Sequence, residues 1–217
     1  MASFSIAYKT HIEPNEGGYA KLPHDKGGRT YAGIAENYNK SWEGWPYIDL
    51  QEMKLKGKPV PNNTKFPDLQ FLVTKFYEDR WKANRFSEIN NQDVANLLFD
   101  YHVHSQSNAI KAIQKIVGVT PDGKMGSQTI QAINKANPAI VHDALLQQRR
   151  NFLEKVINNN PGYESFRKGF AARLAKFPQL VKENALPLGL LAAAAGTILL
   201  VTIANKKKKE NQYQTAV

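Results

Sequence analysis

Apolar residues recur every three to four positions through most of the first 176 residues, the period of helices that bury one face. The pattern predicts helices over residues 4–16, 69–81, 94–101, 107–117, 127–135, 138–157 and 163–176. Gly17-Gly18 ends the first of these, because glycine is the usual residue just past a helix. Asn137 and Pro138 suit the start of the longest helix, since asparagine accepts hydrogen bonds from free amides and proline has no amide to leave unpaired.

Two stretches break this period. Residues 19–34 are rich in Gly, Pro and Asp and predict short extended pieces around a turn at Asp25–Gly28. Residues 41–66 hold two tryptophans and three prolines and predict an irregular loop. The sequence therefore predicts an α+β fold that is predominantly α-helical with a small β-hairpin insertion, in one compact body.

The C-terminal part of the chain has a different composition. From Asn184 to Asn205 no side chain is charged, and residues 186–204 are almost wholly apolar. A helix of that length spans about 28 Å, close to the ~30 Å hydrocarbon core of a bilayer. Lys206–Lys209 follow directly and suit the membrane interface. We therefore expect a single transmembrane helix at 184–205, a lipid bilayer as its partner, and a basic polar tail at 206–217. The topology stays open, and the alternative is a buried core helix.

Composition narrows the chemistry. Hydrophobic side chains make up 42% of the 217 residues, enough for a folded core, and there is no cysteine. The lack of cysteine excludes disulfides, thiolate zinc sites and a cysteine nucleophile. His102 and His104 stand two positions apart on a predicted helix, so they face different sides and cannot chelate one ion together. We expect no metal and no cofactor.

The formal net charge of +10 suggests an anionic partner. The lysines are scattered rather than gathered in a stripe, so we expect no nucleic acid. The tail at 206–217 has four lysines and one glutamate, a net charge of +3 that suits an anionic lipid surface. The remaining +7 suits a protein that approaches an anionic surface such as a cell wall. The oligomeric state is left open.

Two carboxylates near the start of the chain are candidates for catalysis. Glu16 lies at the expected C-terminal end of a helix, where the helix dipole disfavours the charged form. Glycosidic bond cleavage needs a carboxylic acid that is kept protonated. Asp25, on the glycine-rich turn, offers a second carboxylate to activate water or stabilise an oxocarbenium ion. The residues alone also admit a helix-ending glutamate and a turn aspartate without chemistry.

The wider pattern resembles a known family. Glu16-Gly-Gly-Tyr, followed by Asp25-x-Gly-Gly-x-Thr-x-x-Gly-Ile, resembles the N-terminal signature of glycoside hydrolase family 108, lysozyme-like N-acetylmuramidases also described as secretion activators. Further segments resemble the family's second motif, its peptidoglycan-binding region and its closing helices: Leu97–Asp100, Val119–Ile130, Arg150–Phe152 and Phe166–Arg173. The likeness covers about residues 3–176. Lys26 stands where the family usually has proline, and Val103–Gln106 departs from a usual Val-Asn-x-Gly.

The resemblance implies a lysozyme-like catalytic region at 1–105 and a peptidoglycan-binding region at 106–183. It implies cleavage of the β-1,4 bond between N-acetylmuramic acid and N-acetylglucosamine. Glu16 would be the catalytic acid, and Asp25, Thr30 and Tyr31 would line the cleft. The partner would be the glycan strands of peptidoglycan.

The N-terminus lacks the basic start and apolar run of a secretory signal peptide. We therefore expect a phage or prophage lytic protein that reaches the wall by another route, resident in a host membrane or in the lipid layer of a virion. One alternative is a non-catalytic peptidoglycan-binding or structural membrane protein on a lysozyme-like scaffold. Another is a lysis factor that acts through the apolar C-terminal segment.

Overall fold

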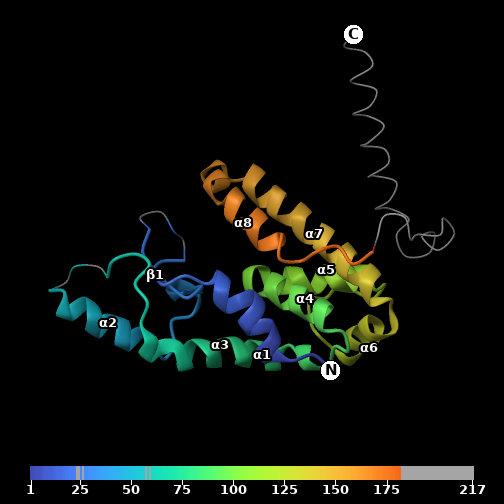
Figure 1. Ribbon diagram of the computed structural model, residues 1–217, viewed down its shortest axis with the longest axis horizontal. Helices are drawn as coiled ribbons and strands as arrows, with labels where there is room; N and C mark the ends of the chain where they lie inside the picture. Colours follow the sequence, from blue (N-terminus) through green and yellow to red (C-terminus); the bar gives the residue numbers. More distant parts are fainter. Residues whose placement is uncertain (23–24, 26, 57, 59, 182–217) are drawn as a thin grey trace, which may run out of the picture. The chain divides into compact units, whose positions relative to one another are not determined.

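The structure is a computed structural model that describes residues 1–22, 25, 27–56, 58 and 60–181 (Figure 1). The chain forms one compact unit over Met1–His104 and a second that begins at Ser105. The predicted membrane helix at 184–205 and the tail at 206–217 lie outside the described residues. Within the described part, no helix is long and apolar enough to cross a bilayer.

The first unit is mainly helical. Its longer helices are α2 (Trp45–Lys54), α3 (Gln70–Ala83) and α4 (Gln92–Ser105). Its short elements are α1 (Phe4–Ala7), the π-helix η1 (Tyr8–Ile12), and the 3-10 turns η2 (Glu13–Asn15), η3 (Glu36–Tyr38), η4 (Pro67–Leu69) and η5 (Phe86–Glu88). The Ser3 hydroxyl caps α1 by accepting from the Ile6 amide at 3.5 Å. The predicted first helix is therefore a continuous helical path that changes its winding twice and ends at Asn15.

A small antiparallel sheet lies where the sequence predicts a hairpin. β1 (Tyr19–Ala20) pairs with β2 (Thr30–Tyr31), and β2 pairs with β3 (Ile34–Ala35). Tyr19 is directly opposite Tyr31, and both side chains are buried. Each strand has only two residues, so buried side chains rather than a long ladder hold the sheet in place.

The prediction of an irregular loop over residues 41–66 is wrong where α2 forms. Trp45 and Ile48 are buried on one side of this helix. Pro46 lies in its first turn, where backbone amides have no intrahelical carbonyl partner, so the proline costs the helix nothing. The prediction failed because it treated Pro46 as a residue that breaks a helix, whereas Pro46 lies in the first turn of α2.

The core of the first unit is aromatic and centred on α4. All residues from Val94 to His102 are buried, so this helix is enclosed on every side. The rings of Phe4, Trp81 and Phe86 pack around Phe99, with centroids 6.2, 5.1 and 5.5 Å from it in edge-to-face geometry. This core supports α1 and α3, and so supports the segment that leads to Glu16.

The second unit is wholly helical in its described part. Its elements are α5 (Ser107–Ile116), α6 (Ser127–Lys135), α7 (Pro138–Asn158), η6 (Pro161–Phe166) and α8 (Arg167–Leu174). The Asn137 side chain accepts from the amides of Ala139 and Ile140 at 3.0 and 3.3 Å, which confirms the predicted cap of α7. α7 and α8 lie side by side (Figure 1).

Candidate active site

Glu16 follows directly on the helical path over residues 4–15 and has an extended backbone. Its amide donates to the Ile12 carbonyl at 3.0 Å, so the residue remains tied to the last helical turn. The path includes the π-helix η1, a winding that is frequent at functional sites. Glu16 is half-buried. It therefore lies just past the end of the helical path, one position beyond the end that the sequence predicts, with part of its side chain open to a ligand.

The carboxylate of Glu16 lies against the turn between β2 and β3. A Cβ atom on Gly33 would stand 2.0 Å from Glu16 Oε2 and 2.6 Å from Tyr77 Oη. Gly33 also has a φ of +75°, in the left-handed region that favours glycine. Tyr77 Oη donates to the Ala32 carbonyl at 2.7 Å and ties the same turn to α3. Glycine at position 33 is therefore what allows the carboxylate to occupy this place.

A cavity of about 310 Å³ opens beside Glu16, a volume at the lower end of those that hold small ligands. Its lining includes Tyr8, Glu13, Glu16, Tyr31, Lys65, Phe66 and Gln70. Tyr31 stacks on Phe66 with ring centroids 5.6 Å apart, and the Tyr31 hydroxyl accepts from the Phe66 amide at 2.7 Å. The cavity thus combines an acid, an aromatic wall and several hydrogen-bonding groups, the combination that recognises a sugar ring.

Two phenols of the cavity have raised pKa values. Burial raises the pKa of Tyr8, and the negative charges of Glu13 and Glu16 raise it further, against two hydrogen bonds that lower it. Burial is also the main cause that raises the pKa of Tyr31. Both hydroxyls therefore remain neutral hydrogen-bonding groups at neutral pH.

The structure brings two of the four predicted site residues together. Glu16 and Tyr31 line the same cavity. Asp25 is exposed, and its Oδ1 accepts from the Gly27 amide at 2.7 Å, so this carboxylate closes its own turn. Thr30 is half-buried in β2. Neither Asp25 nor Thr30 is among the residues that line the cavity.

A second carboxylate of the cavity, Glu13, was missed from the sequence. Its Oε1 accepts from Gln70 Nε2 at 3.0 Å, and the same amide donates to the Tyr8 hydroxyl at 3.1 Å. The spacing of three positions between Glu13 and Glu16 in a helical segment was a usable signal that both lie on one side. Gln70 is 57 positions from Glu13, and no local sequence pattern predicts a contact at that separation.

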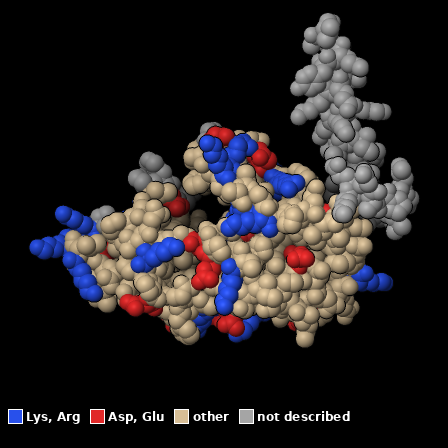
Figure 2. Space-filling model, viewed as in Figure 1, with Lys and Arg blue, Asp and Glu red and all other residues tan. Residues whose placement is uncertain are grey.

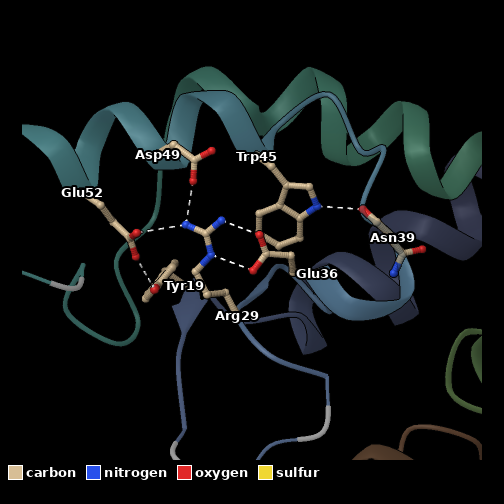
Figure 3. A network of polar contacts seen from close by, with 7 residues as sticks. All are labelled: Tyr19, Arg29, Glu36, Asn39, Trp45, Asp49 and Glu52. Carbon is tan, nitrogen blue, oxygen red and sulfur yellow. Dashed lines mark hydrogen bonds and ion pairs between the residues drawn. The ribbon is translucent and has the colours of Figure 1, made fainter. Parts of the chain in front are cut away.

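An arginine that is only 13% exposed fastens the sheet to α2 (Figure 3). Arg29 donates to both oxygens of Glu36 at 2.8 and 2.5 Å, and to Asp49 and Glu52 of α2 at 2.8 and 3.0 Å. Tyr19 of β1 donates to Glu52 at 2.8 Å. The adjacent guanidinium lowers the pKa of Glu36, so the pair stays ionised. Because Arg29 directly precedes β2, the network also positions the strand that carries Tyr31.

The two histidines of α4 lie in different surroundings. His102 is buried and His104 is exposed, as their spacing predicts. Burial, with the charge of Arg80, lowers the pKa of His102 to about 4, so this ring is neutral at neutral pH. Among the residues that the structure describes, no group of three His, Cys, Asp or Glu side chains is placed to hold a metal ion.

Comparison with family models covers most of the described chain. Residues 10–105 match the model described as Glycosyl hydrolase 108. This segment is a glycosyl hydrolase 108 domain. It contains Glu16, the Arg29 network and all the cavity lining except Tyr8. The match confirms the family indicated by the motifs. Residues 108–175 match the model described as Predicted Peptidoglycan domain. The glycosyl hydrolase 108 domain and its neighbour together indicate a lysozyme-like protein that acts on peptidoglycan.

Among solved structures, the chain is similar to the structure of Brucella abortus SagA. The TM-score is 0.57 and the identity 23%, over 81% of this chain and 92% of that one. At this identity the likeness concerns the fold alone, and it extends beyond the glycosyl hydrolase 108 domain. No curated protein was found to match.

Proposed function

We propose that the protein is a muramidase, which hydrolyses the β-1,4 bond between N-acetylmuramic acid and N-acetylglucosamine in peptidoglycan. The observation that carries this proposal is the position of Glu16. Its carboxylate lies against Gly33, at the wall of a cavity that also contains the stacked rings of Tyr31 and Phe66. The match of residues 10–105 to glycosyl hydrolase 108 supports the same reaction class.

Glu16 acts as the acid in this proposal. It gives its proton to the glycosidic oxygen while the bond from that oxygen to the anomeric carbon breaks, and the bonding electron pair stays on the leaving oxygen. Water then adds its oxygen to the anomeric carbon and releases a proton. Glu13 is the carboxylate of the cavity that is available to take up this proton. Tyr31 contacts the sugar inside the cavity, whereas Asp25 and Thr30 contact the part of the glycan strand that lies outside the cavity.

The test compares the wild type with Glu16→Gln on purified peptidoglycan, with mass analysis of the released fragments. We expect fragments that end in reducing N-acetylmuramic acid from the wild type, and a loss of about 100-fold or more in the variant, because its amide cannot donate a proton in this step. Glu78→Gln, which removes a carboxylate from the exposed Lys82 ion pair, is the matched control. Equal release by wild type and Glu16→Gln would refute the assignment. Sedimentation with peptidoglycan without fragment release would favour a binding or structural protein on this scaffold.

We also propose that residues 184–205 anchor the chain in a membrane. The support is their length, their lack of charge and the four lysines that follow them. Flotation of the full chain with lipid vesicles, compared with a chain that lacks residues 184–217, measures the anchor. Equal flotation of the two chains would remove this part of the proposal without affecting the muramidase test.

A further inference from the structure

The second unit contains a groove between α7 and α8 with a volume of about 430 Å³. Leu153, Ile157 and Leu174 form its apolar floor and are themselves 6, 3 and 8% exposed. Ala171 of α8 and Ala175, which directly follows that helix, have short side chains that leave the groove open. The floor therefore suits small apolar groups such as methyls rather than large rings.

The α7 edge of the groove is polar. Four side chains follow one another along one face of the helix: Gln147, Arg150, Asn151 and Glu154. Glu154 is already paired with Arg167 of α8 at 2.5 Å. Arg150 is half-buried and forms no ion pair with any residue in the described part of the chain. The groove thus offers one uncompensated guanidinium, a group that binds carboxylates through two parallel hydrogen bonds.

Aromatic side chains extend the groove toward η6. Tyr163 and Phe166 are 43 and 45% exposed, and their ring centroids are 5.6 Å apart. Phe170, which lines the groove, lies 6.3 Å from Phe166. Exposed apolar side chains that continue a groove mark a surface that contacts a ligand. Figure 2 shows both signs of charge over the α7–α8 pair, in keeping with a polar rim around an apolar floor.

We propose that this groove binds the stem peptide of peptidoglycan, with Arg150 pairing with a carboxylate of the peptide. The stem peptide is short and carries both alanine methyl groups and free carboxylates, which match the floor and the guanidinium respectively. The groove also lies within the segment that matches the Predicted Peptidoglycan domain. The inference rests on the proposed function only in taking peptidoglycan as the partner: one unit cuts the glycan, and the other holds the peptides attached to it.

The experiment uses the full chain with Glu16→Gln, so that the polymer stays intact, and measures sedimentation with two forms of one peptidoglycan. One form is complete, and the other has had its stem peptides removed. We expect at least tenfold tighter binding to the complete form. Adding Arg150→Gln should abolish that preference. A tenfold loss of affinity is about what the removal of one charge-assisted hydrogen bond costs. Lys155→Gln, which removes a charge from an exposed position of α7 outside the groove, should leave the preference unchanged.

A second pair of variants tests the groove by shape. Ala171→Leu fills it and should weaken binding to the complete form, whereas Ala172→Leu changes a neighbouring exposed position that does not line it and should bind as before. Equal binding to both forms of peptidoglycan, or equal effects within either pair of variants, would overturn the proposal. Fragment release by the wild type reports on the muramidase proposal separately. If the wild type cleaves peptidoglycan but Arg150→Gln leaves the binding preference unchanged, only the groove proposal is refuted. If the binding results are as expected but the wild type releases no fragments, only the muramidase proposal is refuted.

Discussion

Replacing Gly33 by alanine tests whether the turn between β2 and β3 positions the carboxylate of Glu16, the proposed catalytic acid. The new Cβ would stand 2.0 Å from Glu16 Oε2, whereas ordinary contacts of a Cβ atom begin at 3.4 Å. The carboxylate would have to move by more than an ångström. The hydroxyl of Tyr77, 2.6 Å from the same Cβ, blocks an easy relaxation of the turn, because it is held to the Ala32 carbonyl.

The expected effect has two parts. An alanine with a φ of +75° costs about 1–2 kcal/mol of stability, which lowers the melting temperature by about 2–4 °C for each kcal/mol. Displacing a catalytic group by about 1 Å costs about 100-fold in rate, equivalent to about 2.7 kcal/mol in the activation barrier. We therefore expect Gly33→Ala to fold with a modestly lower melting temperature and to lose about 99% of the proposed muramidase activity.

Gly28→Ala is the matched control. Gly28 has a φ of +74°, so alanine there carries the same backbone strain, but the three atoms nearest to its Cβ would belong to the end of the Asn37 side chain, at 3.0–3.2 Å. The assay is fragment release from peptidoglycan, with the melting temperature of each variant measured alongside. We expect the lower melting temperature of the two for Gly33→Ala, because its Cβ also meets the Tyr77 hydroxyl, and near wild-type activity for Gly28→Ala alone. If Gly33→Ala folds and keeps activity within threefold of the control, Gly33 does not set the position of Glu16.

Three further predictions concern stability. Because burial holds the pKa of His102 at about 4, below about 6.5 in an unfolded chain, the unfolded state takes up a proton first as the pH falls from 6.5 to 4. Urea unfolding should show that the free energy of unfolding falls by up to about 3 kcal/mol over that pH window. His102→Gln should reduce this fall, whereas the exposed His104→Gln should not. The same pH dependence in both variants would contradict this assignment. Arg29→Lys keeps the charge but not the planar fork that reaches three carboxylates, and should cost about 2 kcal/mol in the same assay, whereas an unchanged unfolding midpoint would show that the network contributes little. Asn137→Ala removes the cap of α7 and should cost about 1 kcal/mol, and a loss below a few tenths would mean that water replaces the cap.

Local signals in the sequence predicted much of the helical part of the fold. The cap at Asn137 and the extents of α6 and α7 depend on residues within a few positions of one another. The first helical path depends on equally local signals, although it ends at Asn15, one position earlier than predicted. The same reasoning failed at α2, because a proline in the first turn looks the same in a sequence as a proline that breaks a helix. The membrane helix at 184–205 stays a prediction.

The sequence by itself determined which carboxylate to examine, because Glu16 follows a helical period and precedes a Gly-Gly pair, and both signals are local. Only the tertiary structure decided what surrounds that carboxylate. Phe66, Gln70 and Tyr77 reach the site from segments far along the chain. Asp25 does not line the cavity, and its carboxylate accepts a hydrogen bond from Gly27 in its own turn. The physical reason is that helix period and capping act between neighbours in sequence, whereas the cavity depends on how separate segments pack, which no local pattern encodes.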